Sequence, residues 1–183
     1  MTQSLATRMF VGYDAQPLAL YRVLVGAVLI YLRFSLSVLY AGMNHLPVAY
    51  PWLGSLVLPA SQQLALVSPI LLVCAILIML GLLHRVAALV AALIVARLLV
   101  VDLAAYNPLH YLALLILVQL VVLPASNTLS VDNLLARIPG LGALFPASGH
   151  SVPRWAYSLL CAQALVTYTY NGASMLSVDW LVR

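Results

Sequence analysis

The stretch Arg154–Arg183 reads RWAYSLLCAQALVTYTYNGASMLSVDWLVR, and it places polar side chains inside an apolar run. The polar residues of this run are Gln163, Thr167, Thr169, Asn171 and Ser174. In hydrocarbon each such group costs free energy unless it contacts protein or water. The pattern predicts a membrane-spanning helix over residues 154–176 that packs against other spanning helices.

The composition of the whole chain indicates a lipid environment. Of the 183 residues 65% are hydrophobic and 7% are charged, and the mean hydropathy is +1.10. In soluble domains about a quarter of the residues are charged. The eight basic residues are all arginine and the four acidic ones are all aspartate. We expect the net charge of +4 to serve membrane topology and contact with anionic lipids, and we expect no nucleic-acid partner.

Four further apolar runs predict four more spanning helices, since a bilayer core requires about 20 apolar residues. These helices are expected at residues 17–40, 63–83, 86–104 and 108–125. Short turns between neighbouring runs favour antiparallel packing. The predicted fold is a single all-α domain over residues 1–183, an integral membrane bundle of about five transmembrane helices.

Two of the connections between the predicted spans are longer than a turn. Residues 41–62 contain three prolines and two glycines and cannot form one continuous helix. Tyr50 and Trp52 favour an interfacial or re-entrant segment there. In the connection 126–153 we expect a short amphipathic helix from Ser130 to Arg137, with Ser130 as its N-cap.

The arginines near the ends of the predicted spans indicate the orientation. Arg8, Arg85, Arg137 and Arg154 collect on one side of the membrane, and Arg183 lies on the other. We therefore expect a multi-pass protein of the cell's inner (cytoplasmic) membrane, with a cytoplasmic N-terminus and a C-terminus outside.

Several charged or titratable groups fall within or close to the predicted spans. Arg22 and Arg97 are interpreted as structural intramembrane charges, which snorkel or pair with a carboxylate. Asp102 is either solvated near the outer interface or paired with an arginine of another span. His110 is more readily an interfacial hydrogen-bonding group than a ligand. The histidines and cysteines lack metal-ligand spacing, so no metal site is predicted.

Three segments carry a resemblance to a known family. They are PLALYRVLVG (17–26), GLLHRVAALVAALIVARLLVVD (81–102) and YNPLHYLALLILVQLVVLPASNTLSVDNLL (106–135). The last span adds Tyr168, Gly172, Ser174-Met175, Leu176 and Asp179-Trp180 in order. Together they resemble the vitamin K-dependent gamma-glutamyl carboxylases and their bacterial relatives, which share the horizontally transferred transmembrane domain.

The sequence departs from this family at the catalytic pair. In the carboxylases the pair between the Gly and the Leu is Lys-Lys, and one lysine is the base that deprotonates the vitamin. Here the pair is Ser174-Met175, and the sequence contains no lysine. The carboxylases also continue into further spans and a large extracytoplasmic domain, whereas this sequence ends three residues after Trp180. The resemblance therefore implies the membrane shell without carboxylation.

Two functions follow as hypotheses. The first, which we favour, is a small non-catalytic subunit that packs against a larger membrane complex, such as a redox or photosynthetic one, and binds a quinone-like or other lipid. The ligand-contacting residues expected from the resemblance are Tyr168, Asn171, Ser174, Met175, Asp102 and His110. The second is a membrane enzyme or redox protein that acts on quinone-like lipids. No catalytic residue is assigned.

Overall fold

A computed structural model describes residues 10–42, 60–101, 108–125, 130–136 and 151–175. Its elements are β1 (Gly12–Asp14), α2 (Gln16–Gly42), α3 (Ala60–Leu80), α4 (His84–Val101), α5 (Pro108–Val122), α6 (Val131–Leu135), β2 (Ser151–Pro153) and α7 (Arg154–Met175). The described chain is thus almost entirely helical, as predicted. It divides into two compact units, one of residues 15–150 and one of residues 1–14 with 151–183.

The helix bounds differ most from the prediction at the second helix. We expected it over residues 63–83, but α3 begins at Ala60 and ends at Leu80. The interfacial segment was expected over residues 41–62, but Gly42 still belongs to α2 and Ala60 already belongs to α3. Residues 43–59 lie outside the described residues. Hydropathy finds the apolar part of a helix, whereas its hydrogen-bonded ends depend on caps.

Gly81 ends α3 through a Schellman motif. Its N–H donates to the carbonyl of Ile78 at 3.1 Å, and the N–H of Leu82 donates to Leu77 at 3.0 Å. This arrangement requires a left-handed residue, and Gly81 has φ +71°. The chain can therefore reverse within three residues and start α4 at His84.

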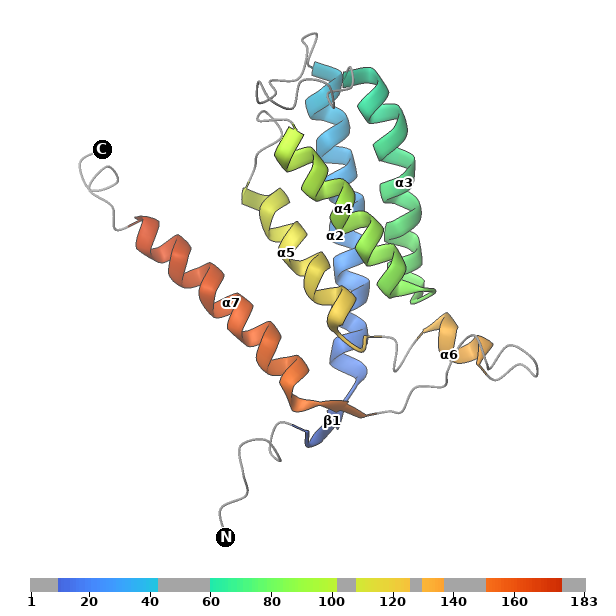
Figure 1. The fold of residues 1–183 in the computed structure, drawn as a ribbon, viewed down its shortest axis with the longest axis vertical. Helices are drawn as coiled ribbons and strands as arrows, with labels where there is room; N and C mark the ends of the chain where they lie inside the picture. The colour runs from blue at the N-terminus through green and yellow to red at the C-terminus, as the bar shows by residue number, and fades with distance from the viewer. Residues whose placement is uncertain (1–9, 43–59, 102–107, 126–129, 137–150, 176–183) are drawn as a thin grey trace. The chain divides into compact units, whose positions relative to one another are not determined.

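The unit of residues 15–150 contains a closed circuit of four helices (Figure 1). In it α2 packs on α3, α3 on α4, α4 on α5, and α5 returns to α2. The alanines of α4 allow close approach, since Ala87, Ala88, Ala91 and Ala92 are buried. A Cβ at Gly26 would lie 2.9 Å from the carbonyl oxygen of Ala75, so α2 also approaches α3 closely. Contact between α2 and α5 is the sparsest of the four.

The second unit is built on a two-stranded sheet that the sequence analysis did not predict. β1 and β2 pair antiparallel, with Gly12 opposite Pro153 and Asp14 opposite Ser151. α7 follows β2 without a linker, and the N–H of Arg154 donates to the carbonyl of Val11 at 3.1 Å. The Tyr157 hydroxyl donates to the carbonyl of Asp14. The first turn of α7 is therefore fixed on the two-stranded sheet. Three-residue strands are too short to show an alternating pattern.

Among the described residues one helical segment, Gln16–Val38, is long and apolar enough to cross a membrane. Shorter apolar segments occupy Ala65–Leu80 and Pro108–Val122. The structure thus agrees with an all-helical membrane protein, and the count of five crossings stays a prediction.

Candidate functional site

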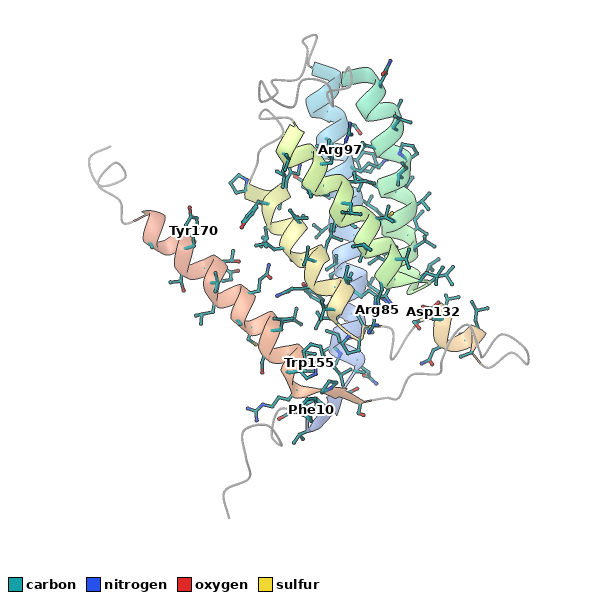
Figure 2. The ribbon with its side chains drawn as sticks, viewed as in Figure 1. Phe10, Arg85, Arg97, Asp132, Trp155 and Tyr170 are labelled. Atoms are coloured by element: carbon teal, nitrogen blue, oxygen red, sulfur yellow. The ribbon has the colours of Figure 1, made fainter. Side chains whose placement is uncertain are left out.

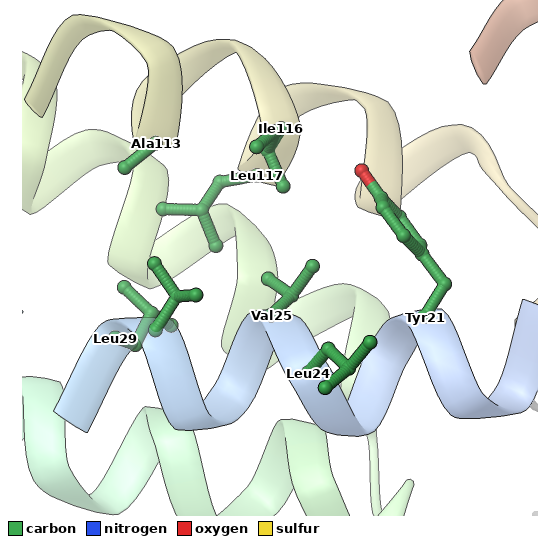
Figure 3. A pocket seen from close by; sticks show the side chains of 8 residues that line it. Tyr21, Leu24, Val25, Leu29, Ala113, Ile116 and Leu117 are labelled. Carbon is green, nitrogen blue, oxygen red and sulfur yellow. The ribbon is translucent and has the colours of Figure 1, made fainter. Parts of the chain in front are cut away.

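A pocket lies along the α2–α5 contact, where the helix circuit is loosest (Figure 3). Its volume is about 200 Å³. Five lining residues come from α2 and three from α5: Tyr21, Leu24, Val25, Val28, Leu29, Ala113, Ile116 and Leu117. On α2 they recur at the spacing of one helix face, so the pocket runs along the helix.

The chemistry of the pocket is that of a hydrocarbon site. Its lining is aliphatic except for Tyr21, whose hydroxyl points toward α5 (Figure 3). Two lining residues, Leu24 and Val28, are exposed, so the pocket is an apolar groove that is open at the surface of the unit. A polar headgroup placed here would lose its hydrogen bonds to water. Among the lining residues, Tyr21 alone has a polar side-chain group that could replace them. The pocket therefore fits an alkyl or isoprenoid segment better than a charged or strongly polar group.

A buried polar cluster lies at one end of the same unit. Arg22 on α2 is fully buried, and its Nη1 donates to the carbonyl oxygen of Ala125 at 2.8 Å. Its guanidinium lies against Gly81, because a Cβ at that glycine would be 2.6 Å from the Arg22 Cζ. The same Cβ would be 2.6 Å from the Cβ of Ser130. Arg22 therefore joins α2, the turn after α3, the end of α5 and the start of α6.

Helix α6 is fastened to the α3–α4 turn beside this cluster. Ser130 caps α6, since its Oγ accepts from the N–H of Asn133 at 3.2 Å, which confirms the predicted cap. The Asp132 carboxylate accepts from the N–H of Leu83 at 3.1 and 3.2 Å. Leu83 has φ +46°, a left-handed conformation that is uncommon for leucine. The carboxylate thus holds a strained residue at the start of α4.

His84 is the buried titratable group of this cluster, at the first position of α4 and before its apolar run. Its Nε2 lies 3.5 Å from the carbonyl oxygen of Leu123. Burial lowers the pKa of the His84 imidazole, and the positive charges of Arg22 and Arg85 lower it further. The Leu123 carbonyl and the Asp132 carboxylate act in the opposite direction. The site therefore favours the neutral imidazole more than water does.

The residues predicted to contact a ligand are distributed over both units. Tyr168 on α7 is 78% exposed, and His110 in the first turn of α5 is buried. Asn171, Ser174 and Met175 belong to α7, but the placement of their side chains is outside the description, as is all of Asp102. Arg97 is half-buried on α4 (Figure 2). Within the described residues there is no group of three or more His, Cys, Asp or Glu that could hold a metal ion.

Sequence reasoning missed the pocket entirely. Because α2 and α5 are apolar around most of their circumference, periodicity does not single out the face that lines a cavity. The sequence contains a partial signal of the polar cluster. An arginine within an apolar run, a glycine at a chain reversal and a capped short helix can each be recognised individually. Only the tertiary structure shows that Arg22, Gly81 and Ser130 meet.

Comparison with known proteins gives one family. The protein-family model described as the HTTM domain matches residues 10–183, nearly the whole chain. This domain is found in vitamin K-dependent gamma-glutamyl carboxylase and related proteins, which confirms the resemblance seen in the sequence. No curated protein and no solved structure matches the chain.

Proposed function

The chain belongs to the HTTM-domain family, and on that premise we propose that it is a non-catalytic membrane subunit that holds the hydrocarbon part of a lipid. The observation that carries this proposal is the α2–α5 pocket of about 200 Å³, with its aliphatic lining. Ligands of this kind include phospholipid chains and the isoprenoid tails of quinones and carotenoids. The subunit packs against a larger membrane protein complex.

The lining chemistry supports binding over turnover. General acid–base catalysis needs a group whose pKa suits proton transfer near the operating pH. Tyr21 is the single titratable residue of the pocket. At the positions that resemble the carboxylases' lysine pair the chain has Ser174 and Met175. Neither side chain can accept a proton at ordinary pH, which favours a retained lipid over a converted one.

Five crossings are part of the proposal, with the helices α2, α3, α4, α5 and α7 as spans. The polar residues of α7 are compatible with hydrocarbon where they bond to their own helix. The Thr169 hydroxyl donates to the carbonyl of Leu165 at 2.7 Å, and the Ser158 hydroxyl donates to Arg154 at 3.3 Å. Such bonds satisfy the donor without a partner helix.

The arginine distribution supports a cytoplasmic location for the end that holds the polar cluster. Contacts from Leu83 to Asp132 and from Arg22 to Ala125 bring the α3–α4 turn and the end of α5 together. Arg85 therefore lies at the same end as α6, whose chain continues to Arg137. Basic residues concentrate on the cytoplasmic side of membrane proteins.

The test is the lipid content of the protein purified in mild detergent. Val28 lines the pocket and is 42% exposed, so Val28→Trp should fill the pocket without burying a ring in the core. The matched control is Val73→Trp on α3, at a valine that is 54% exposed. Mass spectrometry of the extract should find one lipid class retained by the wild type and the control, and lost from Val28→Trp.

Retention of the same lipid by all three proteins would contradict the pocket assignment. Co-purifying membrane proteins, identified from the same preparation, test the subunit role, and their absence under mild conditions would contradict it. Turnover of a reduced quinone by the isolated protein at enzymatic rates, abolished by Tyr21→Phe or His110→Ala, would replace the proposal with the enzyme hypothesis.

A further inference from the structure

The unit that contains β1, β2 and α7 presents exposed aromatic and aliphatic side chains next to an arginine. Phe10 is 72% exposed and Tyr13 is 46% exposed, with Val11 between them also exposed. Arg154 is exposed at the first position of α7, and Trp155 follows it. Figure 2 shows Phe10 near the two-stranded sheet and Trp155 in the first turn of α7. Aromatic rings beside arginine are typical of the headgroup level of a membrane.

The connection to α7 fixes where this patch lies. α7 has 22 residues, which corresponds to about 33 Å of helix, close to the ~30 Å thickness of a hydrocarbon core. β2 ends at Pro153, and α7 begins at the next residue. If α7 spans the bilayer, as the proposed function has it, no linker remains to carry the two-stranded sheet away from the interface.

Direct contacts hold the two-stranded sheet and the first turn of α7 together as one body. The rings of Tyr13 and Tyr157 meet edge to face, with centroids 6.2 Å apart. The Tyr157 hydroxyl and the Arg154 N–H each donate to a carbonyl of the N-terminal segment. The patch is therefore pre-formed, and its aromatic groups need little ordering to enter a headgroup layer.

We propose that β1, β2 and the first turn of α7 form an interfacial anchor that binds the headgroup layer of an anionic leaflet. The depth of the anchor in the headgroup layer is set by Phe10, Tyr13 and Trp155. Arg154 contacts the lipid phosphates. Arg154 follows directly on Pro153, which lies opposite Gly12 at one end of the strand pairing.

Trp155 provides a direct probe of depth. In the variant Trp52→Phe/Trp180→Phe, Trp155 is the remaining tryptophan. The protein is reconstituted in phosphatidylcholine vesicles that contain lipids brominated near the headgroup, in mid-chain or near the chain end. The shallow bromines should quench Trp155 fluorescence several-fold more than the chain-end bromines. Strongest quenching by the deepest bromines, or quenching by aqueous iodide alone, would overturn the anchor.

Arg154 is tested by the charge of the quenching lipid. A spin-labelled phosphatidylglycerol should quench Trp155 more than the same amount of spin-labelled phosphatidylcholine, with a local enrichment of up to about five-fold. Arg154→Gln should abolish this difference. Arg85→Gln, which removes an exposed arginine of the other unit, should preserve it. Equal quenching by both lipids in the wild type would refute the role of Arg154.

These outcomes are distinct from failure of the proposed function. A Trp155 ring that no lipid and no aqueous quencher reaches would mean that protein covers the patch, and the anchor would be wrong. Lipid retention in the α2–α5 pocket, measured by extraction, would be unaffected by that result. Conversely, a result that refutes lipid binding in the α2–α5 pocket would leave the measured depth of Trp155 unchanged.

Discussion

The guanidinium of Arg22 and the carbonyl oxygen of Ala125 are joined by a buried hydrogen bond of 2.8 Å, across 103 residues of sequence. The arginine belongs to the second turn of the first long helix, and the alanine follows the end of α5. The bond therefore closes the helix circuit at the end where the α3–α4 turn and α6 also meet.

Removal of this bond should destabilise the bundle. Arg22→Gln should lower the free energy of unfolding by about 2 kcal/mol, because a hydrogen bond from a charged donor is lost and the Ala125 carbonyl stays buried. Thermal unfolding in detergent, followed by circular dichroism, measures the effect. Arg85→Gln is the control, since an exposed arginine should contribute within about 0.5 kcal/mol. Equal transition temperatures for the two variants would contradict the closing role of Arg22.

Gly81 should tolerate no side chain. In Gly81→Ala the new methyl group would lie 2.6 Å from both the Arg22 Cζ and the Ser130 Cβ, at a φ of +71°. The expected loss is about 1–3 kcal/mol from backbone strain, with further cost from displacement of Arg22. In the control, Gly172→Ala, the methyl group meets no described atom within 4 Å. Gly172→Ala should leave the free energy of unfolding unchanged or raise it, since alanine favours a helix interior. An unchanged transition in Gly81→Ala would show that the cluster yields to the methyl group.

His84 should make stability depend on pH. Its pKa in the folded protein lies below the ordinary value of 6.5, chiefly because of burial. Below pH 6.5 the unfolded chain therefore binds more protons than the folded chain, and the free energy of unfolding should fall as the pH decreases. Above pH 6.5 this contribution is constant.

The measurement is chemical unfolding in detergent between pH 5 and pH 8 for the wild type and His84→Gln. The wild type should lose up to about 1.4 kcal/mol for each pH unit below 6.5, until the folded-state pKa is reached. His84→Gln should show a weaker slope over this range. Parallel slopes would mean that other groups carry the pH dependence.

The sequence predicted the helical character of this protein well because long apolar runs have few alternatives to helix in a membrane. It also located the cap at Ser130, which depends on residues three positions apart. The two-stranded sheet was missed because its pairing joins Tyr13 to Val152, which no local pattern records. The start of α3 was misplaced because polar Ser61 and Gln62 belong to the helix without contributing to hydropathy. The pocket depends on the sparse contact between α2 and α5, and both helices are apolar around most of their circumference.

The α2–α5 contact has a consequence for biogenesis. It joins the first and last helices of the circuit, whereas the other three contacts join helices that are consecutive in the chain. Consecutive pairs can form as soon as both members have been synthesised, but the α2–α5 contact must close a loop of about a hundred residues and awaits α5. On the five crossings that we propose, the pocket wall on α2 therefore faces bulk lipid during insertion. A hydrocarbon chain of the bilayer can then already lie against α2 when α5 arrives.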